Sequence, residues 1–178
     1  MTGEAGLGIA DFNALDEGQA LAVLRELNHS AWWGQAMLAR RPFPDLAALL
    51  DAAEGVWALA DEAARLDAFR GHARIGDREA LRDRFSAAAR EQGNQIDGAD
   101  AAVIDELFHL NRAYEQRHGF LFIICASGRS ASEMRDRLRE RIDNDRVQEL
   151  DTAAREQGAI TALRIRRRFI GSGREEPR

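Results

Sequence analysis

One apolar run constrains the fold of this 178-residue chain more than any other segment. The run extends from Gly119 to Ala126 and lies between two segments that carry charged residues at helical spacing. We therefore expect a short, buried, extended segment at residues 120–126 inside an otherwise helical protein. Buried backbone N–H and C=O groups need hydrogen-bond partners. The pattern offers no second strand to supply them, so this stretch of backbone is open to a ligand.

Helical periodicity dominates the rest of the chain and predicts an all-α, single-domain bundle of about eight helices over residues 1–178, with one short extended segment at 120–126. At this length one domain can bury most of its apolar surface without disulfides. We expect residues 1–10 and 171–178 to be flexible. The predicted helices cover residues 16–27, 30–41, 45–57, 62–69, 78–92, 100–118, a segment starting after the capping box Ser130-Ala131-Ser132-Glu133, and 145–169.

Composition excludes several classes of function. The formal net charge is −5 and all positive charge comes from arginine, which argues against general nucleic-acid binding. Cys125 is the only cysteine, so neither an intrachain disulfide nor a multi-cysteine metal site can form. No apolar run approaches the length of a membrane span, and residues 1–9 show no secretory signal. We expect a cytoplasmic protein that binds neither nucleic acid nor membrane.

The common catalytic motifs are missing from the sequence. No two of the four histidines share a helical face, and no His-Glu-x-x-His pattern occurs, so we expect no metal site. The chain has no phosphate-binding loop, no dinucleotide-binding glycine pattern and no nucleophile elbow. An NTPase, a dehydrogenase and a serine hydrolase of the usual kinds are therefore disfavoured.

Four polar residues remain as candidates for chemistry. His72 follows the predicted end of a helix, where it is either a surface or capping histidine or a group that meets a ligand. Glu91 and Gln92 lie on a weakly apolar helix whose simpler interpretation is a solvated face. Arg164 lies between apolar neighbours and either extends to solvent or pairs with an anion. Together these groups suit proton transfer on a small anionic substrate without a metal.

A set of short motifs, in a defined order from Phe12 to Ile165, resembles the pattern of a known enzyme family. Each motif alone is weak, whereas their order and spacing within one chain are specific. They are Phe12-Asn13-Ala14-Leu15-Asp16, Trp33, Arg41-Pro42-Phe43, His72-Ala73-Arg74-Ile75-Gly76, Glu91-Gln92, Leu110-Asn111-Arg112-Ala113-Tyr114, Gly119-Phe120-Leu121-Phe122-Ile123-Ile124, Gly128-Arg129-Ser130-Ala131, Arg141-Ile142-Asp143-Asn144 and Leu163-Arg164-Ile165.

These motifs resemble the decarboxylases of 2-oxo-4-hydroxy-4-carboxy-5-ureidoimidazoline (OHCU), which form (S)-allantoin in urate degradation. The resemblance implies an all-helical homodimer that needs no cofactor. It implies catalytic roles for His72, Glu91 and Arg164, and substrate binding by Gln92. It also implies that the backbone of the extended run binds the substrate ring, through Phe122, Ile123, Ile124, Cys125 and Ala126. The positions of Ala73 and Ala88 line the family's pocket.

Two departures from the family pattern leave alternatives open. Ala73 stands where the family has a proline after the catalytic histidine, and Ala88 stands where it has a serine. These changes are compatible with a related lyase that acts on another ureido or hydroxy acid. A non-catalytic helical interaction module is a further alternative. The presence of His72 favours an enzyme, because an inactive relative is expected to lose its acid–base group.

Overall fold

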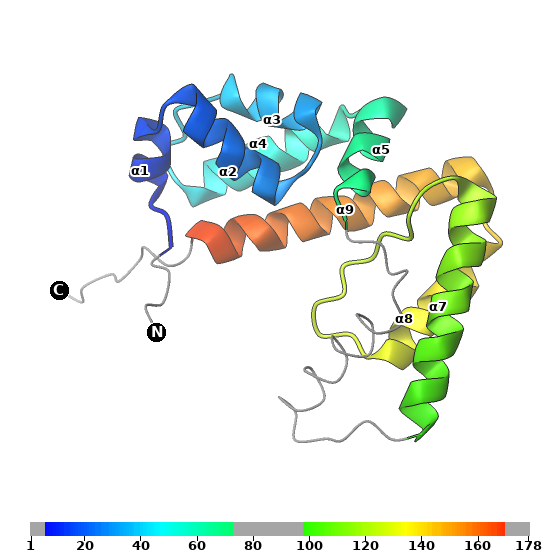
Figure 1. The fold of residues 1–178 in the computed structure, drawn as a ribbon. Coiled ribbons are helices and arrows are strands. Elements are labelled where there is room, and N and C mark those ends of the chain that lie inside the picture. Colours follow the sequence, from blue (N-terminus) through cyan, green and yellow to red (C-terminus); the bar gives the residue numbers. More distant parts are fainter. Residues whose placement is uncertain (1–5, 73–97, 170–178) are drawn as a thin grey trace. The chain divides into compact units, whose positions relative to one another are not determined.

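The structure, a computed structural model, describes residues 6–72 and 98–169, and these form eight helices and no strand (Figure 1). The all-α prediction is therefore confirmed. None of the described helices combines the length and apolar character needed to cross a lipid bilayer. The helices are α1 Ile9–Ala14, α2 Glu17–Leu27, α3 Ala31–Leu38, α4 Leu46–Ala58, α5 Glu62–Arg70, α7 Gly98–His118, α8 Ala131–Ile142 and α9 Arg146–Phe169.

Side-chain caps set where most of these helices begin. In each case a carboxylate or hydroxyl accepts a hydrogen bond from a backbone N–H of the first turn, which otherwise lacks a partner. Ser130 and Glu133 form the predicted capping box of α8. The predicted starts of α2, α3 and α4 are confirmed in the same way. The other capping residues are Asp16, Ser30, Asp45 and Asp61.

Some predicted boundaries were wrong. Helix α3 ends at Leu38 rather than Arg41, because the amides of Arg40 and Arg41 bond to carbonyls three residues back and tighten the last turn. Helix α7 begins at Gly98, two residues before the predicted cap at Asp100. Helix α1 was not predicted. The helix predicted at 78–92 lies outside the described residues.

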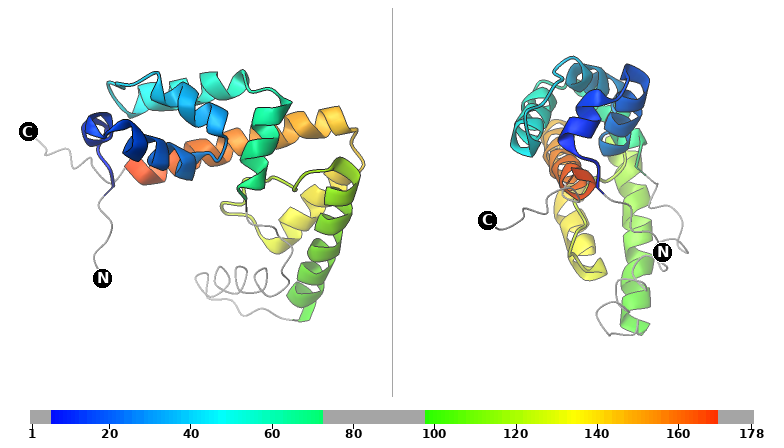
Figure 2. Two further views of the ribbon diagram at one scale, coloured as in Figure 1. Left: turned by 45° about the horizontal axis from the view of Figure 1, so that its top comes forward. Right: turned by 90° about the vertical axis from the view of Figure 1, so that its left-hand side faces the viewer.

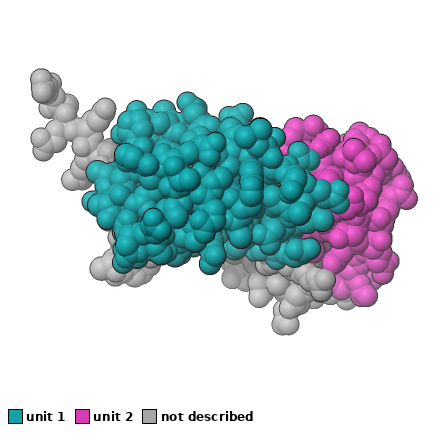
Figure 3. Space-filling view, turned by 90° about the horizontal axis from the view of Figure 1, so that it is seen from above, with its two compact units in different colours: residues 1–71, 157–178 teal, residues 72–156 magenta. Residues whose placement is uncertain are grey.

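The chain divides into two compact units (Figure 3). Residues 1–71 and 157–178 form the first unit, and residues 72–156 form the second. The division at residues 156 and 157 falls within helix α9.

In the first unit, helices α1 to α5 pack with the carboxyl-terminal part of α9 (Figure 2). Phe12 is fully buried and meets the ring of Phe169 edge to face, with centroids 5.6 Å apart. Asn28 donates to the Thr161 hydroxyl at 3.2 Å, which ties the end of α2 to α9. The core of this first unit is made of large apolar side chains that include Trp33, Met37, Leu49 and Phe69.

Two of the motifs near the amino terminus hold each other in this unit. The Asn13 side chain donates to the carbonyl of Phe43 and accepts from its amide, at 2.7 and 3.0 Å. Nη2 of Arg41 donates to the carbonyls of Asn13 and Leu15, each at 2.6 Å, and its guanidinium lies over the ring of Phe12. These motif residues therefore have a structural role, because they close α1 onto the loop before α4.

The second unit contains α7, α8 and the first turns of α9, and α7 and α8 lie side by side (Figure 1). Of the residues at helical spacing on one face of α7, Ile104, Leu107 and Tyr114 are buried, whereas Val103 and Leu110 are half-buried. Residues 119–130 connect α7 to α8 without a helix or strand.

Candidate functional site

The apolar run lies where the sequence predicts an extended segment. Residues 121–126 are neither helix nor strand, and Phe122, Ile123 and Ile124 are buried. Gly119 and Gly128, at the two ends of the run, have φ of 79° and 76°. Glycine tolerates this left-handed conformation without steric strain, so the two positions let the chain leave α7 and turn into α8. The prediction that Gly119 follows the end of its helix is confirmed.

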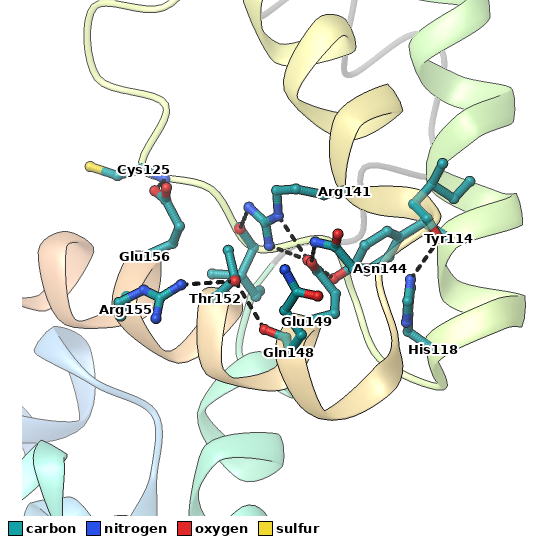
Figure 4. Close-up of polar contacts among 12 residues, drawn as sticks. Tyr114, His118, Cys125, Arg141, Asn144, Gln148, Glu149, Thr152, Arg155 and Glu156 are labelled. Carbon is teal, nitrogen blue, oxygen red and sulfur yellow. Dashed lines mark hydrogen bonds and ion pairs between the residues drawn. The ribbon is translucent and has the colours of Figure 1, made fainter.

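A buried polar cluster fixes the middle of the run (Figure 4). The carboxylate of Glu149, which is fully buried, accepts bonds from Nε and Nη2 of Arg141 at 2.8 and 2.5 Å. It also accepts from the Tyr114 hydroxyl at 2.6 Å and from Asn144 at 2.9 Å. The remaining Nη1 of Arg141 donates to the carbonyl of Ile123 at 2.9 Å. A buried ion pair is tolerated only when its polar atoms are satisfied in this way.

The same cluster orders the aromatic side chains of the run. The Arg141 guanidinium lies 4.6 Å from the centroid of the Phe122 ring. The Tyr114 ring meets Phe122 and Phe120 edge to face. Burial, followed by the bond to Glu149, raises the pKa of Tyr114 far above its ordinary range, so the hydroxyl stays a donor.

The end of the run is held at Cys125 (Figure 4). The Cys125 amide donates to the carboxylate of Glu156 on α9 at 2.7 Å. The Cys125 carbonyl accepts from Nε of Arg129 at 3.0 Å. The backbone of this residue is thus bonded on both its N–H and its C=O.

His72 lies two residues past the end of α5. The helix ends at Arg70, and the amide of its C-cap, Gly71, bonds to the carbonyl of Ala68. A Cβ on Gly71 would lie 2.0 Å from Cγ of His29, so the imidazole of His29 occupies the space that a side chain would need. His72 itself is half-buried. The predicted position of His72 just beyond a helix end is confirmed.

Arg164, on α9, contacts the carboxyl-terminal end of α2. Its Nη1 donates to the carbonyl of Leu27, the last residue of α2, at 3.2 Å, and lies 3.5 Å from that of Glu26. Within the described residues, Nε and Nη2 of Arg164 make no hydrogen bond. Burial lowers the pKa of Arg164 below its ordinary value.

Arg164 and burial together act on His29. Although His29 as a residue is exposed, one face of its ring lies on Gly71. Burial and the nearby positive charge of Arg164 lower the pKa of His29 below 6.5, and Asp67 opposes them. Asp67 also accepts the amide of Ala31 at 2.9 Å, at the start of α3.

The described residues among those expected at the site are divided between the two units. His72 and residues 122–126 belong to the second unit, and Arg164 belongs to the first. Ala73, Ala88, Glu91 and Gln92 lie outside the described residues. In residues 6–72 and 98–169, no group of three or more His, Cys, Asp or Glu side chains could hold a metal ion.

Reasoning from the sequence missed the residues that hold the run. Arg141 and Asn144 were recognised only as parts of a motif, and Glu149 and Glu156 were not singled out at all. One signal was present: Glu149 falls beside Leu150 and four residues before Ala153, both buried, so a carboxylate shares the apolar face of its helix. Such a position calls for a partner.

Comparison with known proteins identifies the family. The sequence model of OHCU decarboxylase matches residues 13–166. The chain belongs to the OHCU decarboxylase family. The 2-oxo-4-hydroxy-4-carboxy-5-ureidoimidazoline decarboxylase of Haloferax volcanii is 24% identical over 164 residues, which cover 92% of this chain and 96% of that protein.

Two further relatives match the chain over shorter segments. The uric acid degradation bifunctional protein TTL of Arabidopsis thaliana is 43% identical over 79 residues, 44% of this chain and 24% of that protein. The OHCU decarboxylase of Amia calva is 39% identical over 70 residues, 39% of this chain and 38% of that protein. The chain therefore matches well under two thirds of the length of either relative.

Two solved structures share the fold of this chain. A crystal structure of OHCU decarboxylase in the presence of (S)-allantoin aligns with a TM-score of 0.70 at 27% identity, covering 88% of this chain and 99% of that chain. A crystal structure of (S)-allantoin synthase aligns with a TM-score of 0.66 at 17% identity, covering 91% of this chain and 54% of that one, and supports the fold alone.

Proposed function

We propose that this protein decarboxylates OHCU to (S)-allantoin in urate degradation. The observation that carries the proposal is the family match over residues 13–166, a range that includes His72 just past the end of α5. We further propose that the enzyme is a carboxy-lyase without a cofactor, and that it works in the cytoplasm as a homodimer. Ala73 and Ala88 make a related ureido or hydroxy acid the alternative substrate.

The proposed reaction breaks one carbon–carbon bond and consumes one proton. When carbon dioxide leaves, its bonding electrons form a double bond to the neighbouring ring carbon. The electrons of the adjacent C=N bond move onto nitrogen, which takes a proton. The resulting enol then gains a proton on that neighbouring carbon and loses its hydroxyl proton, which yields the ring amide carbonyl of allantoin.

Arg164 and the extended run bind the substrate in this proposal. The edge of the Arg164 guanidinium that faces away from Leu27 can pair with the negative charge of the substrate. Backbone groups of the run bind the substrate ring equally in the ground state and in the transition state, and so hold the ring in place. Neither group needs to change protonation during the reaction.

His72 supplies the proton in this proposal. An imidazole with an ordinary pKa near 6.5 exchanges protons readily at neutral pH. Delivery to one face of the planar enol sets the handedness of allantoin. Without the protein, both faces are equivalent and the product is racemic. Glu91 orients His72 or the substrate hydroxyl, and Gln92 binds the ureido group.

The test is a circular-dichroism assay on freshly generated OHCU. We expect the purified chain to accelerate decay and to produce optically active allantoin. His72→Asn should lower turnover by about 10²–10⁴-fold, the usual contribution of a general acid–base group. His109→Asn is the matched control, because His109 is exposed on α7.

Three outcomes would count against parts of the proposal. Racemic product formed at the spontaneous rate would reject the decarboxylase function. A His72→Asn variant within a few-fold of wild type would remove His72 from the mechanism. Sedimentation of the active enzyme as a monomer would reject the homodimer.

A further inference from the structure

Side chains from outside the extended run bond to its backbone at alternate residues, Ile123 and Cys125. Arg141 binds the carbonyl of Ile123, and Glu156 and Arg129 bind the N–H and C=O of Cys125, at 2.7 to 3.0 Å. Both helices that follow the run take part, since Arg141 lies on α8 and Glu156 on α9.

This alternation separates the two edges of the run. In an extended backbone, successive residues direct their N–H and C=O groups to opposite edges, as in a strand. The groups of Ile123 and Cys125 therefore face one edge, which the side chains occupy. By this alternation we place the groups of Ile124 on the other edge, and among the described residues they have no hydrogen-bond partner.

A buried amide without a partner is costly, and Ile124 is only 8% exposed. The cost is recovered when a ligand supplies the missing donor and acceptor. Amide groups of this kind match a ring that carries N–H and C=O groups side by side. The orientation of Ile124 then depends on the residues that hold its two neighbours.

We infer that Glu156 is a positioning residue for the reaction. Its carboxylate holds the Cys125 N–H on the occupied edge, and this keeps the amide groups of Ile124 directed to the open edge, where the substrate ring binds. Within the described residues, this is the only hydrogen bond of the Glu156 carboxylate. The inference rests on the proposed function, because it needs a substrate that uses the open edge.

The first test compares Glu156→Ala with Glu156→Gln in the full-length protein. Alanine removes the acceptor, so KM for OHCU should rise about tenfold, the factor for one lost hydrogen bond, while kcat stays close to wild type. Glutamine keeps a side-chain oxygen at the same reach and should restore wild-type KM. Glu140→Ala is the matched control, because Glu140 is exposed on α8 and pairs only with Arg137 in the described part of the chain.

The second readout uses the thiol of Cys125, the only cysteine in the chain. It is half-buried, so its rate of reaction with an aromatic disulfide reports on the local conformation of the run. We expect Glu156→Ala to raise this rate under conditions in which far-ultraviolet circular dichroism shows the fold intact. Glu156→Gln and Glu140→Ala should react as wild type does.

The outcomes separate this inference from the proposed function. If wild type is active and Glu156→Ala matches it in KM and in thiol reactivity, the inference alone is overturned. If glutamine is as impaired as alanine, or if kcat falls while KM stays unchanged, Glu156 acts through its charge and not by positioning. An inactive wild type overturns the function and this inference together. If alanine prevents folding, Glu156→Met fills the same space without an acceptor and carries the same expectations.

Discussion

At the scale of single residues, the contact between Gly71 and His29 is the tightest constraint near the proposed catalytic histidine. The atoms that a Cβ on Gly71 would meet are Cβ and Cγ of His29, at 2.3 and 2.0 Å. These atoms lie close to the backbone, so the imidazole cannot simply rotate away. Either the ring of His29 or the backbone before His72 has to move.

We expect Gly71→Ala to destabilise the protein by about 1–3 kcal/mol, as overpacking usually does, and to lower activity because the backbone before His72 shifts. Gly55→Ala is the control, since nothing lies within 4 Å of a Cβ at that helical position. There we expect a gain of about 0.5–1 kcal/mol, because alanine favours a helix interior. Urea unfolding measures both changes. A Gly71→Ala variant as stable as wild type would contradict the tight contact.

Arg164 also acts on the ionisation of its neighbour His29. Burial and the Arg164 charge lower the pKa of His29, so the folded protein binds a proton there less readily than the unfolded chain does. This group therefore has no effect on stability well above pH 6.5. As pH falls from 6.5 through the lowered pKa, the unfolded state binds more protons and stability decreases.

We predict that Arg164→Gln raises the pKa of His29 toward 6.5, and that Asp67→Asn lowers it further. Removing a nearby positive charge favours the imidazolium, and removing a negative charge disfavours it. Titration of the histidine ring protons by NMR measures both shifts. Arg166→Gln is the control, because Arg166 is exposed and lies on α9 two residues after Arg164. An unchanged pKa in Arg164→Gln would show that burial alone is responsible.

At the scale of elements, the Arg141–Glu149 pair joins α8, α9 and the extended run. Glu149 is fully buried and Arg141 is 7% exposed, so neither charge is solvated. Loss of one partner leaves the other charge buried without compensation. An exposed ion pair such as Arg137–Glu140, with side chains 56% and 62% exposed, is not subject to this cost.

We therefore expect Arg141→Ala to reduce the free energy of unfolding by about 3–5 kcal/mol, the usual effect of breaking a buried ion pair. Arg137→Ala should cost less than about 1 kcal/mol, as exposed pairs do. Urea denaturation followed by circular dichroism gives both values. Similar losses in the two variants would mean that the buried cluster contributes no more than a surface pair.

At the scale of the whole molecule, function is expected to depend on protein groups alone. The chain carries one cysteine, and the described ranges hold no group of side chains suited to a metal ion. The candidate donors and acceptors in residues 6–72 and 98–169 are an imidazole, a guanidinium and backbone amides. Such groups stabilise charge and move protons without a metal.

We predict that dialysis against a chelator leaves the rate of OHCU decay unchanged, and that added divalent ions have no effect. The measurement is the rate at which optical activity from allantoin appears, compared at equal protein concentration before and after dialysis. Loss of activity that one specific ion restores would overturn the prediction. Such a result would place the ligands outside the described residues.

The helices and their starts could be read from the sequence because they depend on local chemistry. Asp16, Ser30, Asp45 and Ser130 each bond an amide a few residues away, so a short stretch of sequence contains both partners. The place of the apolar run and the glycine at its start follow for the same reason. The family could be recognised because motif order is a property of the chain itself.

Tertiary structure alone decided how the run is held and what surrounds the candidate arginine. Ile123 meets Arg141 and Cys125 meets Glu156 across 18 and 31 residues of sequence, and Arg164 meets Leu27 across 137. Hydrogen bonds need distances near 3 Å and suitable angles. Spacing along a chain sets such geometry only within one turn of a helix or between neighbours in a turn. Contacts between distant residues depend on how the elements pack, and the physics of packing involves all side chains of the core together.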